Sequence, residues 1–116
     1  MRHLQATKKF HRPRDQRQAL IRSMAHALIM KGRIRSTSAR AKFLKKTVER
    51  WLTRAKKNDL AGLRYLLDRL PKASAFKLFN EIAPKYKNRA GGYLRVIKLP
   101  LPRKHDAAEL SLIEFV

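Results

Sequence analysis

Four histidines are the side chains of this chain best suited to acid–base chemistry, because imidazole titrates near neutral pH. None has the spacing of a metal-binding or catalytic motif such as HExxH, and two fall near the N-terminus, in a segment too polar to be held rigidly. We therefore predict no catalytic residues, no metal ligands and no cofactor, and keep a small ribonuclease that uses His11 and His26 as one alternative. The four are His3, His11, His26 and His105.

The eight carboxylates and the glycine pair offer no catalytic pattern either. Asp15, Asp59 and Asp106 stand where helix caps or turns are expected, and the other five carboxylates have basic neighbours at short range. Gly91 and Gly92 match neither the GxxxxGK[ST] phosphate loop nor the GxGxxG dinucleotide fingerprint. We predict a tight turn with positive φ there. The absence of cysteine excludes disulfides, thiolate zinc sites and cysteine nucleophiles.

Positive charge is the chemistry that this chain has in excess. Its 29 Lys and Arg face 8 Asp and Glu, which gives a formal net charge of +21. Residues 1–57 hold 18 of the basic and 2 of the acidic side chains, whereas residues 58–116 hold 11 and 6. Such self-repulsion destabilises a compact domain, and binding to a polyanion compensates for it by releasing counterions. We therefore expect a nucleic acid partner.

An anionic membrane surface is the competing partner. No apolar run approaches the roughly 20 residues of a membrane span, and the basic N-terminus lacks the apolar core of a signal peptide, so we predict no membrane association. A nucleoid-type DNA-binding protein remains the alternative function, although the sequence offers no heptad seam for dimerisation. Because the chain also lacks an RRM-type aromatic strand and a homeodomain-like recognition helix, structured RNA read by shape and phosphate fits best.

Apolar residues at helical spacing indicate the elements that must position these cations. Residues 1–14 are too polar to form a core, so we predict a flexible basic arm there and one globular domain over residues 15–116. Asp15 is the expected cap of a first helix that stops at Gly32 and buries Leu20, Ile21, Met24, Ala27 and Leu28. Thr37 or Ser38 is the expected cap of a second helix, whose buried face consists of Ala41, Leu44, Val48, Trp51, Leu52 and Ala55.

Two further helices and three strands complete the expected fold. Asp59 should cap a third helix that ends at Pro71 and turns inward Leu60, Leu63, Leu66, Leu67 and Leu70. Ser74 should start a fourth helix, which Pro84 ends or kinks, with an apolar face of Phe76, Phe79, Ile82 and Ala83. Strands are expected over residues 33–37, 93–99 and 110–116. The fold class is therefore α+β, with about four helices packed on a small mixed or antiparallel sheet of about three strands.

The RNA-contacting residues that we predict fall into three groups. The arm would thread between RNA segments through Arg2, His3, Lys8, Lys9, Arg12 and Arg14. The folded body would hold phosphates with Arg17, Arg22, Arg33, Arg35, Lys42, Lys45 and Lys46. Next to the glycine pair, a second contact would consist of Arg89, Tyr93 and Arg95. The aromatic residues of the helices, in contrast, are expected to pack in the core.

The ordered motifs of the chain resemble a known family. The start MRH, the segments QRQALIRSMAHAL and RIRST-SARAKFLKKTVE, the stretch KLFNEIAPKYKNRAGGYLRVIKL and the final LSLIEFV are similar to the bacterial large-subunit ribosomal protein numbered seventeen. RAGGYLR, at residues 89–95, is the most specific of these motifs. The resemblance implies a non-enzymatic structural protein of the cytoplasmic ribosome that binds large-subunit (23S) rRNA. It also implies neighbouring large-subunit proteins near the exit side as partners, and no small-molecule substrate.

Overall fold

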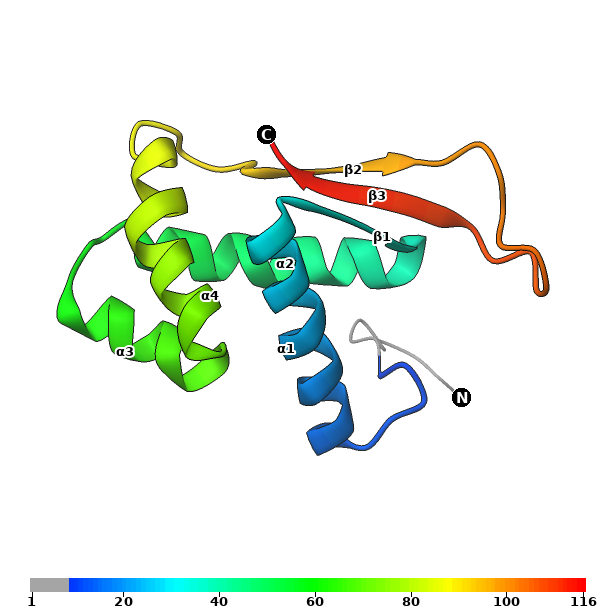
Figure 1. Ribbon diagram of the computed structural model, residues 1–116, viewed down its shortest axis with the longest axis horizontal. Helices are drawn as coiled ribbons and strands as arrows, with labels where there is room; N and C mark the ends of the chain where they lie inside the picture. The colour runs from blue at the N-terminus through cyan, green and yellow to red at the C-terminus, as the bar shows by residue number, and fades with distance from the viewer. Residues whose placement is uncertain (1–8) are drawn as a thin grey trace, which may run out of the picture.

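The computed structural model describes residues 9–116 (Figure 1). The helices are α1 (Arg14–Lys31), α2 (Ser38–Ala55), α3 (Leu60–Arg69) and α4 (Lys72–Lys77), and α4 continues into a π-helical turn (Leu78–Ile82) and a 3-10 turn (Ala83–Tyr86). The strands are β1 (Arg33–Thr37), β2 (Leu94–Lys98) and β3 (Leu110–Phe115). The predicted α+β class with four helices and three strands is confirmed. Within this described part, no helix is both long and apolar enough to cross a membrane.

The three strands form one antiparallel sheet in the order β1-β3-β2. Ile34 and Val96 both stand opposite Ile113 of the central strand β3. The side chain of Ile113 is fully buried. The helices gather on one side of the sheet, and α2 runs beneath it (Figure 1). The buried hydroxyls of Ser38, at the start of α2, and Ser111, in β3, are hydrogen-bonded at 2.5 Å. This bond ties the helix layer to the middle of the sheet.

Helix α2 forms the centre of the core. All six residues of its predicted apolar face are buried, and the largest of them, Trp51, keeps 7% of its surface exposed. The helix contacts all three strands as well as α1 and α3. The prediction for this helix is confirmed, because a regular apolar period on a long helix leaves only one face that can turn inward.

Helix α1 differs from its prediction at its start and in its buried face. It begins at Arg14, directly after Pro13, so Asp15 falls within the first turn and does not cap the helix. Ala25 and Ile29 are buried with Ile21 and Leu28, whereas the predicted Leu20, Met24 and Ala27 are only half-buried. The inward face is therefore rotated toward α2, α4 and β1, which α1 contacts. The stop at Gly32, with φ of 85°, is confirmed.

Helix α3 starts as predicted but buries less of itself. The Asp59 carboxylate accepts a hydrogen bond from the Gly62 amide at 2.7 Å, which is the expected cap. Of the five leucines predicted to point inward, only Leu66 and Leu70 are buried, while Leu60 is 61% exposed. The five leucines lie within about 120° of one face of the helix, and packing buries only one edge of that stripe, at Gly62, Leu66 and Leu70.

Helix α4 begins two residues before the predicted Ser74, whose hydroxyl instead donates to the Pro71 carbonyl at 3.0 Å. Ala75 and Leu78 are buried, whereas the predicted Phe76 and Phe79 are half-buried. The expected disturbance at Pro84 is confirmed as the change from π-helical to 3-10 geometry. The turn at the glycine pair is also present, with φ of 63° at Gly92.

Candidate nucleic-acid interface

The outward face of α2 carries the largest run of cations in the chain. Because its apolar face is buried against the sheet and helices, the remaining side chains point away from the core. Lys42, Lys46 and Arg50 are exposed, and Lys45 is half-buried. Glu49 is the only carboxylate of this helix, and its Oε1 accepts a hydrogen bond from the Leu94 amide at 3.2 Å. Its charge is therefore used to hold β2.

Ion pairing divides the cations of the molecule into two groups. Of the 29 Lys and Arg, all but Arg2 and Lys8 belong to the part of the chain that the structure describes. Within that part, four ion pairs are present: Arg69–Asp68 at 3.6 Å, Arg95–Glu114 at 2.7 Å, Lys98–Glu109 at 3.3 Å and Arg103–Asp106. None of them involves a described residue before position 58. The described cations of α1, β1 and α2 thus all lack a carboxylate partner, whereas four of the 11 cations after position 57 have one.

The start of α1 brings three predicted arginines together beside α2. Arg17 donates to the carbonyl of Arg12 at 3.3 Å, and Arg12 donates to the carbonyl of Phe10 at 3.2 Å. The Phe10 ring packs edge-on against Phe43, with ring centroids 5.5 Å apart. Residues 10–14, predicted as part of the arm, therefore lie against the body. The predicted Lys9 is exposed, and Arg2, His3 and Lys8 lie outside the described residues.

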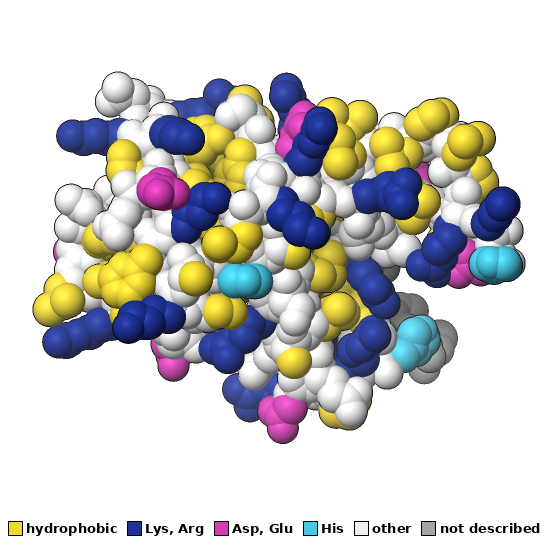
Figure 2. Space-filling view, viewed as in Figure 1, with side chains coloured by type: hydrophobic (Ala, Val, Ile, Leu, Met, Phe, Trp, Pro, Cys, Tyr) yellow, Lys and Arg dark blue, Asp and Glu magenta, His cyan; other side chains and the backbone are white. Residues whose placement is uncertain are grey.

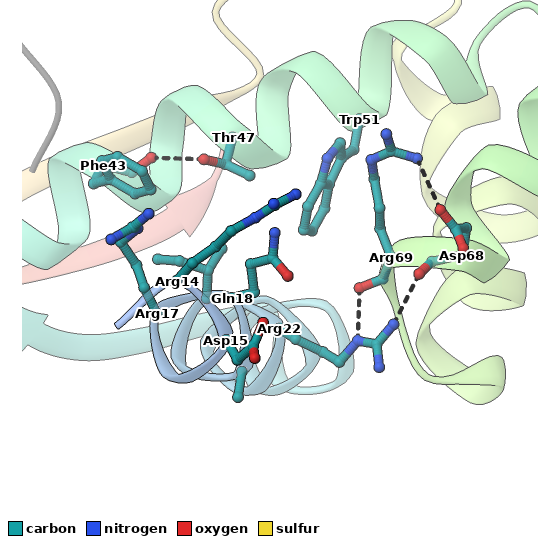
Figure 3. A pocket seen from close by; sticks show the side chains of 12 residues that line it. Arg14, Asp15, Arg17, Gln18, Arg22, Phe43, Thr47, Trp51, Asp68 and Arg69 are labelled. Atoms are coloured by element: carbon teal, nitrogen blue, oxygen red, sulfur yellow. Dashed lines mark hydrogen bonds and ion pairs between the residues drawn. The ribbon is translucent and has the colours of Figure 1, made fainter. Parts of the chain in front are cut away.

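A groove of about 630 Å³ lies between α1, α2 and α3 (Figure 3). One of its walls is aromatic, with Phe43 and Trp51 from α2. Around these rings, Figure 3 shows the side chains of Arg14, Gln18 and Arg69 converging from α1 and α3. The groove thus combines an aromatic wall with guanidinium groups. A nucleotide carries the matching groups, because its base has an apolar face and its phosphate is an anion.

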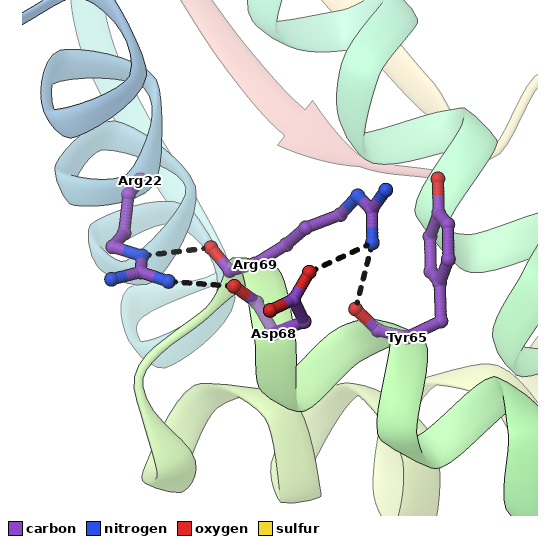
Figure 4. A network of polar contacts seen from close by, with 4 residues as sticks. All are labelled: Arg22, Tyr65, Asp68 and Arg69. Atoms are coloured by element: carbon purple, nitrogen blue, oxygen red, sulfur yellow. Dashed lines mark hydrogen bonds and ion pairs between the residues drawn. The ribbon is translucent and has the colours of Figure 1, made fainter. Parts of the chain in front are cut away.

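Arg22, predicted to hold phosphate, is partly committed within the protein. Its Nε donates to the Arg69 carbonyl at 2.9 Å and its Nη2 to the Asp68 carbonyl at 2.8 Å (Figure 4). Both acceptors belong to the C-terminal end of α3, where carbonyls lack partners within the helix. Arg22 therefore fixes α3 against α1. The neighbouring Arg69 lies over the Tyr65 ring at 3.6 Å, and sequence reasoning did not select it.

The remaining predicted residues lie on or beside the sheet. Arg33 and Arg35 of β1 are exposed. In the register of the sheet Arg33 stands opposite Glu114 of β3. The carboxylate of Glu114 makes its ion pair with Arg95 of β2. Arg89 is exposed, and its Nε donates to the Gly91 carbonyl at 3.2 Å.

Tyr93 is the one predicted contact that the structure buries among the described residues, with 1% of its surface exposed. Its hydroxyl accepts a hydrogen bond from Lys56 Nζ at 2.8 Å. The Tyr93 ring therefore packs in the core, as the other aromatic residues were expected to do. Its contact with RNA stays a prediction.

The space-filling view shows the outcome of this arrangement on one face. Lys and Arg side chains are spread over all the elements visible there, and Asp and Glu side chains are few (Figure 2). Histidines are scattered on this face rather than gathered. His26 lies in α1, about 18 Å along the helix from Arg14 at 1.5 Å per residue, and His11 precedes that helix. Nothing brings these two imidazoles together as a ribonuclease would require.

Three groups with shifted pKa values, Tyr86, Arg103 and Asp106, lie away from the basic elements. The Arg103 guanidinium and the Ala108 amide hydrogen-bond to Asp106 and lower the pKa of that carboxyl to about 2. Burial raises the pKa of Tyr86, whose hydroxyl donates to the Val116 carbonyl at 2.7 Å. In the described portion, no group of three or more His, Asp or Glu could hold a metal ion. These groups stabilise the hairpin and the end of the sheet, where no reacting centre is formed.

The known proteins to which this chain is similar belong to one family. The family model described as Ribosomal protein L17 matches residues 20–116. The chain is 48% identical to the large ribosomal subunit protein bL17 of Hydrogenobaculum sp., with 100% of this chain and 99% of the relative covered. It is also 48% identical to the protein of that name from Persephonella marina, with 100% and 95% covered. Such similarity over the full length, together with the α+β fold, shows that the chain belongs to the ribosomal protein L17 family.

Proposed function

We propose that this member of a large-subunit ribosomal protein family stabilises folded large-subunit (23S) rRNA by placing phosphates against α2, β1 and the start of α1. One observation carries the proposal. In the described chain up to residue 57, the two carboxylates make no ion pair, whereas cations are dense. Lys and Arg left without internal carboxylates gain the most from an external polyanion, because each neutralised phosphate releases counterions.

The rigidity of the supporting elements suits an architectural role. Helix α2 is anchored along its length by seven buried residues, six of them apolar, so its outward lysines keep their spacing of about one helical turn. The side chains themselves stay flexible, which lets them follow the irregular backbone of a folded RNA. Phosphate contacts of this kind fix position and orientation without reading base sequence.

The salt dependence of RNA binding tests this proposal. If about six to ten phosphates are neutralised, the affinity for a folded rRNA fragment should fall by roughly 10³–10⁵-fold between 50 and 200 mM salt on the duplex-DNA scale, and somewhat less for RNA. Filter binding of the full chain over that range measures it. A flat response would contradict the proposal. Duplex DNA at matched salt is the control, and equal or tighter binding to it would favour the nucleoid-type alternative.

Association with the subunit is a separate part of the proposal. A tagged copy of the chain should cosediment with large subunits from the cytoplasm and stay bound after washing at moderate salt. Neighbouring large-subunit proteins near the exit side are the partners that we expect there. Cosedimentation with small subunits alone, or with neither, would contradict this placement.

A further inference from the structure

The groove between α1, α2 and α3 has the dimensions of a binding site for a small organic group. Its volume of about 630 Å³ falls within the range of 300–1,000 Å³ in which ligand pockets usually lie. A phosphate contact on an open helix face needs no such hollow. We propose that this groove binds one unpaired nucleotide of the RNA, with its base between the helices; the inference rests on the proposed function.

The wall formed by α2 fits a base. Phe43 and Trp51 are two turns apart on that helix, and Thr47 lies between them. Trp51 is anchored in the core, with 7% of its surface exposed, so its position is fixed before any ligand binds. Every base has an apolar π-face, and aromatic contacts of this kind are tolerant of sequence.

The charges around the groove fit a phosphodiester. Arg14, Arg17, Arg22 and Arg69 lie along it with the carboxylates of Asp15 and Asp68. Arg69 pairs with Asp68 at 3.6 Å, so the three arginines of α1 are the ones without an ion pair. Hydrogen bonds to the end of α3 hold the guanidinium of Arg22 in place. The side chain of Arg14 points across the groove toward α2 (Figure 3) and makes no hydrogen bond or ion pair with a described residue. Because no internal contact has to be broken, Arg14 is the guanidinium that we expect to bind a phosphate most readily.

Polar groups at the α1 side favour a base that is free of its pairing partner. The Gln18 amide can both donate and accept, and the Asp15 carboxylate can accept from an exocyclic amine. A base inside a duplex hides these edges and stacks on its neighbours, so it cannot enter a groove between helices. An unpaired adenine or cytosine offers the amine, the flat face and the phosphate together.

Trp51 reports directly on this groove, because it is the single tryptophan of the chain. The full chain is titrated with a short RNA hairpin that carries unpaired adenines, and with a perfectly paired RNA duplex of equal charge. Binding is followed separately by the anisotropy of a dye on the RNA. We expect Trp51 emission to fall by at least a third at saturation with the hairpin, and by less than a tenth with the duplex.

Two variants with unchanged melting temperatures complete the test. Arg14→Ala should reduce the Trp51 response at least threefold at saturating hairpin. Lys46→Ala, on the exposed face of α2 and outside the groove, should weaken binding yet leave the response at saturation intact. Hairpin binding without a Trp51 response, or a response unchanged by Arg14→Ala, would overturn the inference and leave the proposed function standing. Failure of both RNAs to bind would instead refute the proposed function.

Discussion

The basic elements before residue 58 and the hairpin formed by β2 and β3 use the same side chains in opposite ways. Three of the four ion pairs of the described residues lie in the hairpin, at Arg95–Glu114, Lys98–Glu109 and Arg103–Asp106. Helix α2, in contrast, carries cations along its whole outward face and gives its one carboxylate to a backbone amide. Most cations of the hairpin are neutralised by its own carboxylates, whereas the cations of α2 remain available to bind an external anion.

This difference teaches that the number of cations in a segment does not by itself mark an interface. Arg95 was predicted to contact RNA, as Lys45 was, yet its guanidinium is 2.7 Å from the Glu114 carboxylate. A cation held by a carboxylate gains less from a phosphate, because the existing pair must be broken first. Ion pairing with a carboxylate distinguishes these two cations, and only the folded structure shows which cations are paired.

The largest effect that we expect comes from removing the unpaired cations. A Lys42→Ala, Lys45→Ala, Lys46→Ala triple variant should lose about tenfold or more in RNA affinity per contact, since a charge-assisted hydrogen bond contributes about 1.5–3 kcal/mol. The slope of log affinity against log salt should fall by about one per lost contact. Filter binding to an rRNA fragment at several salt concentrations measures both quantities.

The matched control removes three paired cations of the hairpin, by Arg95→Ala, Lys98→Ala and Arg103→Ala together. The change in formal charge is the same, but the loss of RNA affinity should be at least tenfold smaller. Equal losses from the two triple variants would show that net charge alone matters, and the comparison between the two regions would fail.

Glu49 provides the next largest effect. Glu49→Ala removes the acceptor of the buried Leu94 amide, and we expect it to lower the free energy of unfolding by about 1–3 kcal/mol. RNA affinity should stay the same or rise, because the variant is more basic. Urea unfolding and filter binding test the two parts, with Glu49→Gln, which keeps an acceptor, as the control. A large loss of affinity with unchanged stability would contradict a structural role.

A smaller effect is expected at Tyr86, where the last 3-10 turn meets the end of the sheet. Tyr86→Phe deletes the hydrogen bond to the Val116 carbonyl and should cost about 1 kcal/mol. Because burial raises the pKa of this phenol above 10.0, its contribution is complete below pH 10 and declines as pH rises through the folded-state pKa. Denaturant unfolding at pH 7 and pH 10.5 should show that the cost of Tyr86→Phe shrinks at the higher pH.

The smallest effect is local to the hairpin tip. The pKa of Asp106 is lowered from 3.8 to about 2, first by its hydrogen bond with Arg103. The stability that this pair gives to the loop is therefore complete above pH 4 and is lost as pH falls toward 2. An NMR titration that follows the Ala108 amide should report this pKa, and Arg103→Ala should move it back toward 3.8. RNA affinity at neutral pH should hardly change.

Sequence reasoning predicted the scaffold of the interface better than the interface itself. The buried face of helix α2 was predicted in full, because its apolar residues leave a single inward face, but Thr37 at its N-cap makes no capping hydrogen bond with its side chain. Too many leucines of helix α3 were predicted to be buried, since they share one apolar stripe and only packing decides which edge of it meets the core. The groove was not predicted at all. Its residues Phe43, Gln18 and Arg69 come from three helices, and no pattern within one helix indicates that they meet.

The hydroxyl bond between Ser38 and Ser111 has a consequence for how the molecule folds. The two residues are 73 positions apart, and β3 lies between β1 and β2, which do not pair with each other. A growing chain that has made β1, α2 and β2 therefore has no sheet, and Ser38, in the first turn of α2, lacks its hydrogen-bond partner. Contacts between such distant segments form slowly, because loop closure must precede them. The cations of α2 are thus synthesised long before the strand that holds their helix in place, and RNA met in that interval would encounter the helices first and the sheet last.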